Sequence, residues 1–415
     1  MDYFNYRGED LYAEDILVSD LAKEYGTPLY VYSQKTLERH VKAFDEALKG
    51  RRHRICYAVK ANSNLAILNL MARLGTGFDI VSEGELRRVI AAGGDPHKCV
   101  YSGVGKTRDE IRFALSQGID CLNIESEAES LVVSEVAAEL DIVAPVALRV
   151  NPNVDAKTLP AISTGLKNNK FGIAHEEAIR IYKHMAQDPH LKIVGIDCHI
   201  GSQMTTGTPI VEATDRLLEI YNVLKEEGIA LDHIDLGGGL GVTYDNETPP
   251  SPADYFAAVS ERLGNIDVAV YVEPGRAMVA NAGVLLTKVQ YQKNNGSRHF
   301  VIVDGAMNDL IRPALYGSWM NIINAKKHAG DAVLSDVVGP VCESDDFLGK
   351  DRRLNVIDGD ILVVRGAGAY GSSMSSNYNT RRLPAEIMVN GNKSYVIRAR
   401  QSYEDIWKDE SILPE

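Results

Sequence analysis

The sequence lacks the cysteine pattern of a disulfide-bonded or zinc-binding protein. Only five cysteines occur among 415 residues, and no two of them form a CxxC pair. An odd number of such cysteines favours reduced thiols in a cytoplasmic protein and predicts no metal site. Four of them lie in or beside apolar runs and are expected in the core, namely Cys56, Cys99, Cys121 and Cys198.

The chain also lacks an excess of positive charge and any long apolar run. Its net charge of −13 at pH 7 argues against nucleic acid or an anionic membrane as the main partner. No apolar stretch approaches the length of a membrane span, and the first ten residues, MDYFNYRGED, do not resemble a signal peptide. With 45% apolar and 24% charged residues, the composition is that of an ordinary globular protein.

What the sequence does contain is a repeated alternation of short β-branched runs with longer amphipathic segments. This alternation is typical of βα units around a parallel sheet. Eight such runs within roughly 250 residues predict an α/β fold with a (β/α)8, TIM-like barrel over residues 31–280. The runs are ICYAV (55–59), FDIV (78–81), CVYS (99–102), CLNI (121–124), PVALRV (145–150), VGIDCHI (194–200), HIDLG (233–237) and VAVYVE (268–273).

The pattern changes after the barrel segment. Strand-like runs are now separated by turn residues instead of helices, and MVNGNKSYVI has the Asn-Gly centre of a hairpin. Residues 281–415 are therefore predicted to form a second, mostly antiparallel β-sandwich or barrel domain, which residues 1–30 are expected to join. The runs are GVLLTKVQYQK, HFVIVDG, ILVVRG, AEIMVNG and KSYVIRA.

Polar residues stand at or just after the ends of the predicted barrel strands. Lys60 is notable because it ends an apolar run, and lysine is almost never fully buried unless it is paired or used. In a barrel of this type the active site lies at the C-terminal ends of the strands. These end positions are Lys60, Asp79, Ser82, Ser102, Glu125, Arg149, Asn151, His199, Ser202, Gly237 to Gly239, Glu273 and Arg276.

Each of these residues also has a purely structural explanation. Lys60 alone is compatible with a rim lysine, His199 with a structural histidine, and the glycine cluster GGGLG (237–241) with an ordinary turn. However, the loops after strands seven and eight of such barrels commonly hold phosphate through backbone N–H groups. The joint placement of the glycines, EPGR (273–276) and Lys60 favours a phosphorylated ligand together with an amine nucleophile.

Eight segments, in this order along the chain, resemble the fold-type-III, alanine-racemase-like family of pyridoxal-phosphate-dependent decarboxylases. They are YAVKAN, GFDIVSEGEL, HIGSQ, DLGGGLG, EPGR, RPALYG, VCESDD and GAYGSSMSSNYN, and they extend from about residue 28 to about residue 400. Within this family the chain is similar to the diaminopimelate decarboxylases. The resemblance implies a carboxy-lyase that converts meso-2,6-diaminopimelate to L-lysine and CO2, the last step of lysine biosynthesis.

The resemblance also implies roles for individual residues toward pyridoxal 5'-phosphate. Lys60 would bind the cofactor covalently, His199 would stack on its ring, and Glu273 would pair with its protonated pyridine nitrogen. An alanine racemase has an arginine facing this nitrogen, so Glu273 favours decarboxylation over racemisation. The other implied cofactor-binding residues are Ser202, Gly237, Gly238, Gly239, Gly275, Arg276 and Tyr370, with Asp79 and Arg149 as supporting groups.

For the substrate, the resemblance implies a site with groups of both charges. A diamino dicarboxylic acid presents a distal carboxylate as well as a distal amine, and arginine suits a carboxylate because its planar fork binds both oxygens. Arg276 and Arg312 would bind the carboxylate, with Tyr316 and Tyr370 beside them, and Glu343 would bind the amine. Cys342 would protonate the carbon that loses CO2. Taken alone, Arg312 is compatible with a surface arginine and Cys342 with a core cysteine.

Two further expectations concern assembly and alternatives. In the family the active site forms between two chains, so the resemblance implies a homodimer with composite sites. Related decarboxylases acting on arginine or carboxynorspermidine remain the main alternative. An amino-acid racemase should not carry Glu273 or the arginine pair, and a non-catalytic carrier of the cofactor would lack the second domain with its CES and GAY motifs.

Overall fold

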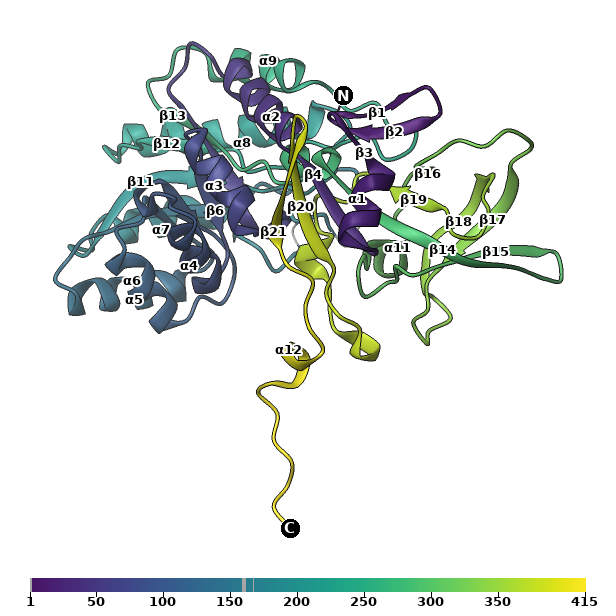
Figure 1. Cartoon of the computed structure of the whole chain (residues 1–415). Coiled ribbons are helices and arrows are strands. Elements are labelled where there is room, and N and C mark those ends of the chain that lie inside the picture. Colours follow the sequence, from purple (N-terminus) through teal and green to yellow (C-terminus); the bar gives the residue numbers. More distant parts are fainter. Residues whose placement is uncertain (1, 159–161, 167) are drawn as a thin grey trace. The chain divides into compact units, whose positions relative to one another are not determined.

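The computed structural model describes residues 2–158, 162–166 and 168–415 (Figure 1). The chain divides into two compact units, each described here by itself. The barrel unit comprises His40–Thr243 and Glu247–Met278, and the β unit comprises Met1–Arg39, Tyr244–Asn246 and Val279–Glu415.

A closed parallel barrel forms the centre of the barrel unit, as the sequence predicts. The eight strands pair in parallel, the last of them pairs with the first, and the pairing of β8 with β9 completes the ring. Their apolar runs are almost entirely buried, as expected for strands covered by helices on one face and packed inside on the other. The strands are β5 (His53–Ala58), β6 (Gly77–Ile80), β7 (Cys99–Tyr101), β8 (Cys121–Ile124), β9 (Ala144–Asn151), β11 (Leu191–Asp197), β12 (His233–Asp235) and β13 (Ala269–Val272). The four cysteines expected in the core are buried and free.

Helices connect these strands, and several begin at a polar side chain that caps the first turn. Ser82, Thr107 and Ser126 each accept a hydrogen bond from the backbone N–H three residues later. Each cap starts its helix within a few residues of the preceding strand, so the loops between these strands and helices are short. The helices are α2 (Gln34–Ala47), α3 (Leu65–Arg73), α4 (Glu83–Ala91), α5 (Arg108–Ser116), α6 (Glu127–Glu139), α7 (His175–Met185), α8 (Thr208–Glu226), α9 (Pro252–Leu263) and α10 (Arg276–Val279).

The β unit is a mixed, mostly antiparallel sheet. Its strands follow the order β18-β17-β15-β14-β4-β20-β21, with β19 pairing β14 and β16. The predicted hairpin is confirmed, since β20 and β21 pair across a turn at Gly391, whose φ is +62°. The strands are β4 (Leu29–Ser33), β14 (Gly283–Asn295), β15 (Arg298–Val303), β16 (Ile322–Asn324), β17 (Val333–Val338), β18 (Phe347–Leu354), β19 (Ile361–Val364), β20 (Ala385–Asn390) and β21 (Lys393–Arg398).

A few shorter elements complete the chain. The N-terminal residues form a separate three-stranded sheet of antiparallel pairs, followed by a helix. Among the described residues, no helix combines the length and apolar character needed to cross a membrane. The short elements are β1 (Phe4–Arg7), β2 (Asp10–Ala13), β3 (Ile16–Leu17), α1 (Val18–Tyr25), β10 (Ile173–Ala174), α11 (Arg312–Tyr316) and α12 (Glu404–Trp407).

A buried histidine packs inside the barrel unit at the start of β12. The His233 ring stacks on the Tyr271 ring with centroids 4.1 Å apart, and its Nε2 is buried without a hydrogen-bond partner. A Cβ at Gly195 would lie 2.2 Å from this nitrogen, so the ring fits only against a glycine. Burial lowers the pKa of His233 to about 4.

This pKa predicts a loss of stability in acid. Histidine in the unfolded chain has a pKa of about 6.5. Between that pH and about pH 4, His233 is therefore protonated in the unfolded chain but not in the folded chain. The contribution is fully favourable above about pH 6.5 and falls until about pH 4, by about 3 kcal/mol in total. His233→Phe should flatten the slope of unfolding free energy against pH in this window, measured by chemical denaturation. If the His233 variant and the parent have the same slope, the assignment is contradicted.

Candidate active site

Lys60 lies just beyond the end of the first barrel strand. β5 ends at Ala58, and the chain then turns through the 3-10 helix η1 (Val59–Ala61), whose start is held by a hydrogen bond from Ala58 N to Pro274 O at 3.2 Å. The Lys60 ammonium forms an ion pair with the buried carboxylate of Asp79, at the end of β6. About a third of the Lys60 side chain remains exposed, so its amine is anchored but reachable from solvent.

The glycine loop after β12 packs too closely on its neighbours for any other residue. A Cβ at Gly237, Gly238 or Gly239 would come within 2.4 Å, 2.3 Å and 2.2 Å of a neighbouring atom, respectively. Gly237 and Gly239 also have positive φ values of +65° and +116°, which side chains rarely adopt. The loop therefore presents bare backbone at the same strand ends as Lys60, the kind of surface that phosphate-binding loops use.

His199 follows β11 and is held by this loop. Its Nδ1 accepts a hydrogen bond from the Gly238 backbone N–H at 3.1 Å. Burial lowers the pKa of His199 well below its usual value, and the positive charges of Arg149 and Lys60 lower it further. The imidazole is therefore neutral at neutral pH, with Nδ1 as the acceptor and the proton on Nε2.

Glu273 directly follows β13 and is almost completely buried. Its Oε1 has no hydrogen-bond partner, and its Oε2 lies 4.0 Å from His199 Nδ1. Burial raises the pKa of Glu273 well above its usual value, and the charges of Asp79 and Asp235 add to the effect. A buried carboxyl with an unsatisfied oxygen needs a donor, which a ligand with an N–H group would supply.

Ser202 and Arg276 come together from different loops of the same barrel unit. The Nε of Arg276 donates a hydrogen bond to the Ser202 hydroxyl oxygen at 3.2 Å. Arg276 is the first residue of α10 and is largely buried, and Gly275 precedes it. The two side chains thus place a hydroxyl and a guanidinium next to each other, a pairing suited to an anionic ligand.

Two further predicted residues of the barrel unit form supporting contacts. Arg149, at the end of β9, makes an ion pair of 2.9 Å with Glu125. Glu125 also accepts hydrogen bonds from the backbone N–H groups of Gly103 at 3.0 Å and Gly172 at 2.6 Å. Glu125 therefore holds two loops and Arg149 in fixed positions at the strand ends.

In the β unit, Arg312 begins the short helix α11 and Tyr316 ends it. The Arg312 side chain is buried, and its guanidinium lies over the Tyr244 ring, 4.7 Å from the centroid. It also donates to the Met320 sulfur at 3.4 Å. A cation–π contact of this kind orients the Arg312 guanidinium against the Tyr244 ring.

Cys342 and Glu343 lie on an exposed loop of the β unit. The Cys342 backbone N–H donates to Asn379 Oδ1 at 2.8 Å, and the Tyr378 hydroxyl hydrogen-bonds to the Glu343 carboxylate. Both side chains are exposed, unlike the four core cysteines. Tyr370 lies in the same unit with a positive φ of +54°, a strained conformation for a residue with a side chain.

Comparison with known proteins gives one consistent family. Residues 34–280 match the pyridoxal binding domain of pyridoxal-dependent decarboxylases. The chain is 56% identical to the diaminopimelate decarboxylase of Vibrio cholerae over the full length of both proteins. The chain belongs to the diaminopimelate decarboxylase family. A diaminopimelate decarboxylase from Helicobacter pylori, solved in complex with L-lysine, is 42% identical with a TM-score of 0.91, over 94% of this chain and 98% of that one.

The same fold extends to a more distant decarboxylase. A lysine decarboxylase structure from Selenomonas ruminantium is 26% identical with a TM-score of 0.83, covering 93% of this chain and 97% of that one. The two-unit plan is therefore shared by enzymes whose names state different substrates, and the fold alone does not define the substrate.

The barrel unit fits pyridoxal phosphate, the cofactor of this family. The unpartnered Oε1 of Glu273 can accept a hydrogen bond from a protonated ring nitrogen, and a neutral His199 can lie against a cationic ring without repulsion. The bare backbone of Gly237 to Gly239 suits a phosphate. The residues present therefore fit the group.

Three acidic residues near this site were not found from the sequence. Glu85, on α4, accepts a hydrogen bond from Val81 N at 2.7 Å, and burial raises its pKa to about 7. Asp197 and Asp235 lie at the last positions of β11 and β12, inside the barrel. A signal was present for the last two, because each is an acidic residue inside a predicted strand run, VGIDCHI (194–200) or HIDLG (233–237).

Proposed function

We propose that the chain catalyses the pyridoxal-phosphate-dependent decarboxylation of meso-2,6-diaminopimelate to L-lysine and CO2. The observation that carries this proposal is the buried carboxyl of Glu273, whose Oε1 has no hydrogen-bond partner, at the strand ends that also carry Lys60. A buried acid in this place suits a cofactor whose ring nitrogen must stay protonated. The full-length identity of 56% to a diaminopimelate decarboxylase supports the choice of substrate.

In this proposal the barrel unit holds the cofactor. Lys60 Nζ would bind it covalently, and Asp79 positions that side chain through their ion pair. The backbone of Gly237, Gly238 and Gly239, together with Gly275, would hold the phosphate. Ser202 and Arg276 complete this anion site, because their hydrogen bond already aligns a hydroxyl with a guanidinium.

Two side chains set the charge of the cofactor ring. Bound pyridoxal phosphate supplies an electron sink for the carbon that loses CO2. Glu273 would keep a proton on the ring nitrogen, which strengthens that sink. His199 would lie on the ring face, where its neutral imidazole avoids repulsion with a positive ring.

The β unit would recognise the substrate and return a proton. Arg312, with Arg276, binds the distal carboxylate in this proposal, and Tyr316 lies at the other end of the Arg312 helix. Glu343 binds the distal amine, and Tyr370 touches phosphate and substrate. Cys342 Sγ donates a proton to the carbon that has lost CO2.

The proposed assembly is a homodimer with two composite sites. The exposure of Cys342 and Glu343 supports this, because catalytic groups that serve a partner chain must lie at the surface of their own. The free cysteines among the described residues support a reducing, cytoplasmic location.

The cofactor assignment predicts one labelled peptide. Reduction of the protein with borohydride in the presence of pyridoxal phosphate should attach a pyridoxyl group to Lys60, located by peptide mass spectrometry. Lys106, whose ammonium is tied up by Glu129 and two backbone carbonyls, should stay unlabelled. A label elsewhere in the chain but absent from Lys60 would refute the assignment. The substrate is tested separately by measuring CO2 release from a panel of diamino acids.

A further inference from the structure

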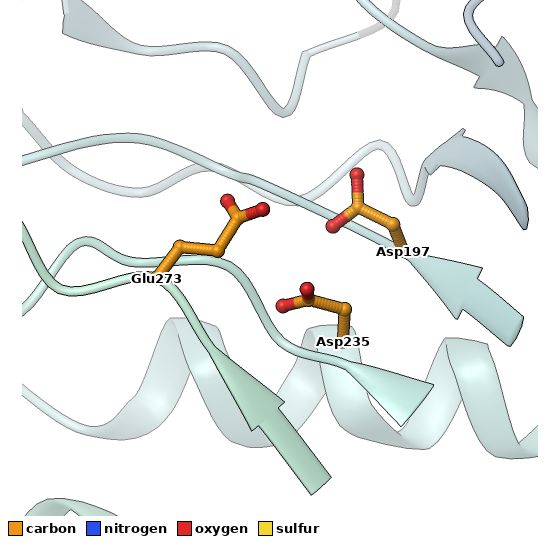
Figure 2. A group of neighbouring side chains, drawn as sticks. All are labelled: Asp197, Asp235 and Glu273. Carbon is orange, nitrogen blue, oxygen red and sulfur yellow. The ribbon is translucent and has the colours of Figure 1, made fainter. Parts of the chain in front are cut away.

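Three carboxyl groups meet inside the barrel, at the ends of three neighbouring strands. Figure 2 shows Asp197, Asp235 and Glu273 pointing toward one another from adjacent parts of the sheet. Asp197 and Asp235 are direct register partners on β11 and β12, and Glu273 follows β13. One oxygen of each lies within 4.8 Å of one oxygen of each of the others, and all three side chains are buried.

The hydrogen bonds of the three groups are unequal. Asp235 Oδ1 accepts a hydrogen bond from the Gly237 backbone N–H at 2.9 Å. Neither oxygen of Asp197 has a partner, and one oxygen each of Asp235 and Glu273 is also without one. A carboxylate is stabilised by a donor, so Asp235 is the best placed of the three to be ionised and Asp197 the worst.

The charges around the cluster do not neutralise it. Within the described residues, the charged groups that act on it include two cations and two further acids. Lys60 already pairs with Asp79, and Arg149 with Glu125, so neither cation is exclusive to the cluster. Burial and mutual repulsion raise the pKa of all three cluster carboxyls. The groups facing the cluster are Lys60, Asp79, Glu125, Arg149 and neutral His199.

We propose that Asp197 is a positioning residue that keeps a proton and shares it with Asp235, so that the pair carries a single negative charge beside Glu273. This inference rests on the proposed function, in which Glu273 faces the ring nitrogen. One negative charge behind Glu273 strengthens its hold on the ring proton. A second negative charge would add repulsion that Lys60 and Arg149, each already paired with another acid, do not offset, and the absence of any charge would weaken the hold.

If Asp197 acts as a neutral hydrogen-bond donor, two substitutions of similar size, Asp197→Asn and Asp197→Leu, should have different effects on cofactor binding. Asparagine keeps a neutral donor in that place, whereas leucine removes it and leaves the Asp235 carboxylate with the Gly237 backbone N–H as its remaining donor. Asp197→Leu should weaken pyridoxal phosphate binding to the cofactor-free chain by roughly ten- to a hundredfold, the factor expected for losing a hydrogen bond to a charged group. Asp197→Asn should stay within roughly threefold of the parent, measured by equilibrium dialysis.

An infrared measurement tests the proton itself without any cofactor. At neutral pH, the difference spectrum between the cofactor-free parent and Asp197→Asn should show loss of a protonated carboxylic acid band. Asp232→Asn, at an exposed aspartate of the same chain, should show no such loss. If the Leu variant does not fold, this comparison still decides the question.

Three results would overturn the proposal. They are an unchanged acid band in Asp197→Asn, equal weakening by the Asn and Leu variants, and an equivalent of bound metal that elemental analysis finds in the parent but not in Asp197→Asn. The last would mean that a cation joins the three oxygens where we infer a proton. If the parent releases no CO2 from diaminopimelate, the proposed function fails instead, and the infrared result still reports on the proton.

Discussion

Replacing Arg312 with methionine is expected to lower kcat/KM for meso-diaminopimelate by roughly 30- to several-thousandfold. The reason is the loss of a buried cation that the distal carboxylate of the substrate would need. Leaving a buried carboxylate without its partner costs about 2–5 kcal/mol, which gives this range of rate constants. Methionine preserves the length and apolar stem of arginine, so packing against the Tyr244 ring is largely kept. The measurement is steady-state CO2 release over a range of substrate concentrations.

The affinity for pyridoxal phosphate should change little in this variant, because Arg312 is not among the residues proposed to bind the cofactor. Arg353→Met, at an exposed arginine on β18 of the same unit, provides the matched control and should retain activity. Near-normal activity of the Arg312 variant on diaminopimelate would show that this side chain does not bind the distal carboxylate.

The barrel could be predicted from the sequence because each of its eight strands overlaps a short apolar run. All eight apolar runs became strands, since a parallel sheet covered by helices must be apolar on both faces. The end of the first strand could be located for the same reason, because the apolar run that ends at Val59 is followed directly by Lys60. His199 lies inside the predicted run VGIDCHI (194–200), and it follows β11 because that strand ends earlier, at Asp197.

The β unit was harder, and four strands of its sheet, β4, β16, β17 and β18, were not among the predicted runs. β18 contains the charged run Lys350 to Arg353, and its buried positions are Leu348, Gly349, Arg352 and Leu354. A charged run of this kind hides the alternation by which a strand is recognised. Arg352 is buried because its guanidinium donates to Met320 O and stacks on Trp319, contacts that only the folded chain reveals.

Asp197 and Asp235 were missed for a different reason. In the predicted runs VGIDCHI (194–200) and HIDLG (233–237) both residues lie in the middle, whereas the strands of the structure already end at Asp197 and Asp235. Their significance depends on register, since β11 and β12 pair so that the two carboxyls become neighbours. Register between separate strands cannot be read from one sequence, so the cluster is visible only in the structure.

Two variants that are inactive alone, Lys60→Ala and Cys342→Ala, are expected to regain activity when they are mixed. Lys60→Ala removes the proposed covalent lysine from the barrel unit, and Cys342→Ala removes the proposed proton donor from the β unit. Each homodimer should be nearly inactive, because both of its sites carry the same defect. If each site takes its lysine from one chain and its cysteine from the other, the two defects fall in different sites of a mixed dimer according to two-fold symmetry.

Mixing the two variants should therefore restore activity. After brief dissociation and reassociation, about half of the dimers should be hybrids, and each hybrid should contain one intact site and one doubly defective site. Activity should recover to roughly a quarter of that of the unmodified protein, with subunit exchange followed by native mass spectrometry. A mixture of Lys60→Ala with Asp79→Ala is the matched control, since both residues belong to the same barrel unit and each site then keeps one defect. Recovery in the first mixture but not in the second would establish a site built from two chains. Subunit exchange without recovery of activity would show that the exposed Cys342 does not complete the site of a partner chain. Cys342 would then belong to the site of its own chain or to no active site.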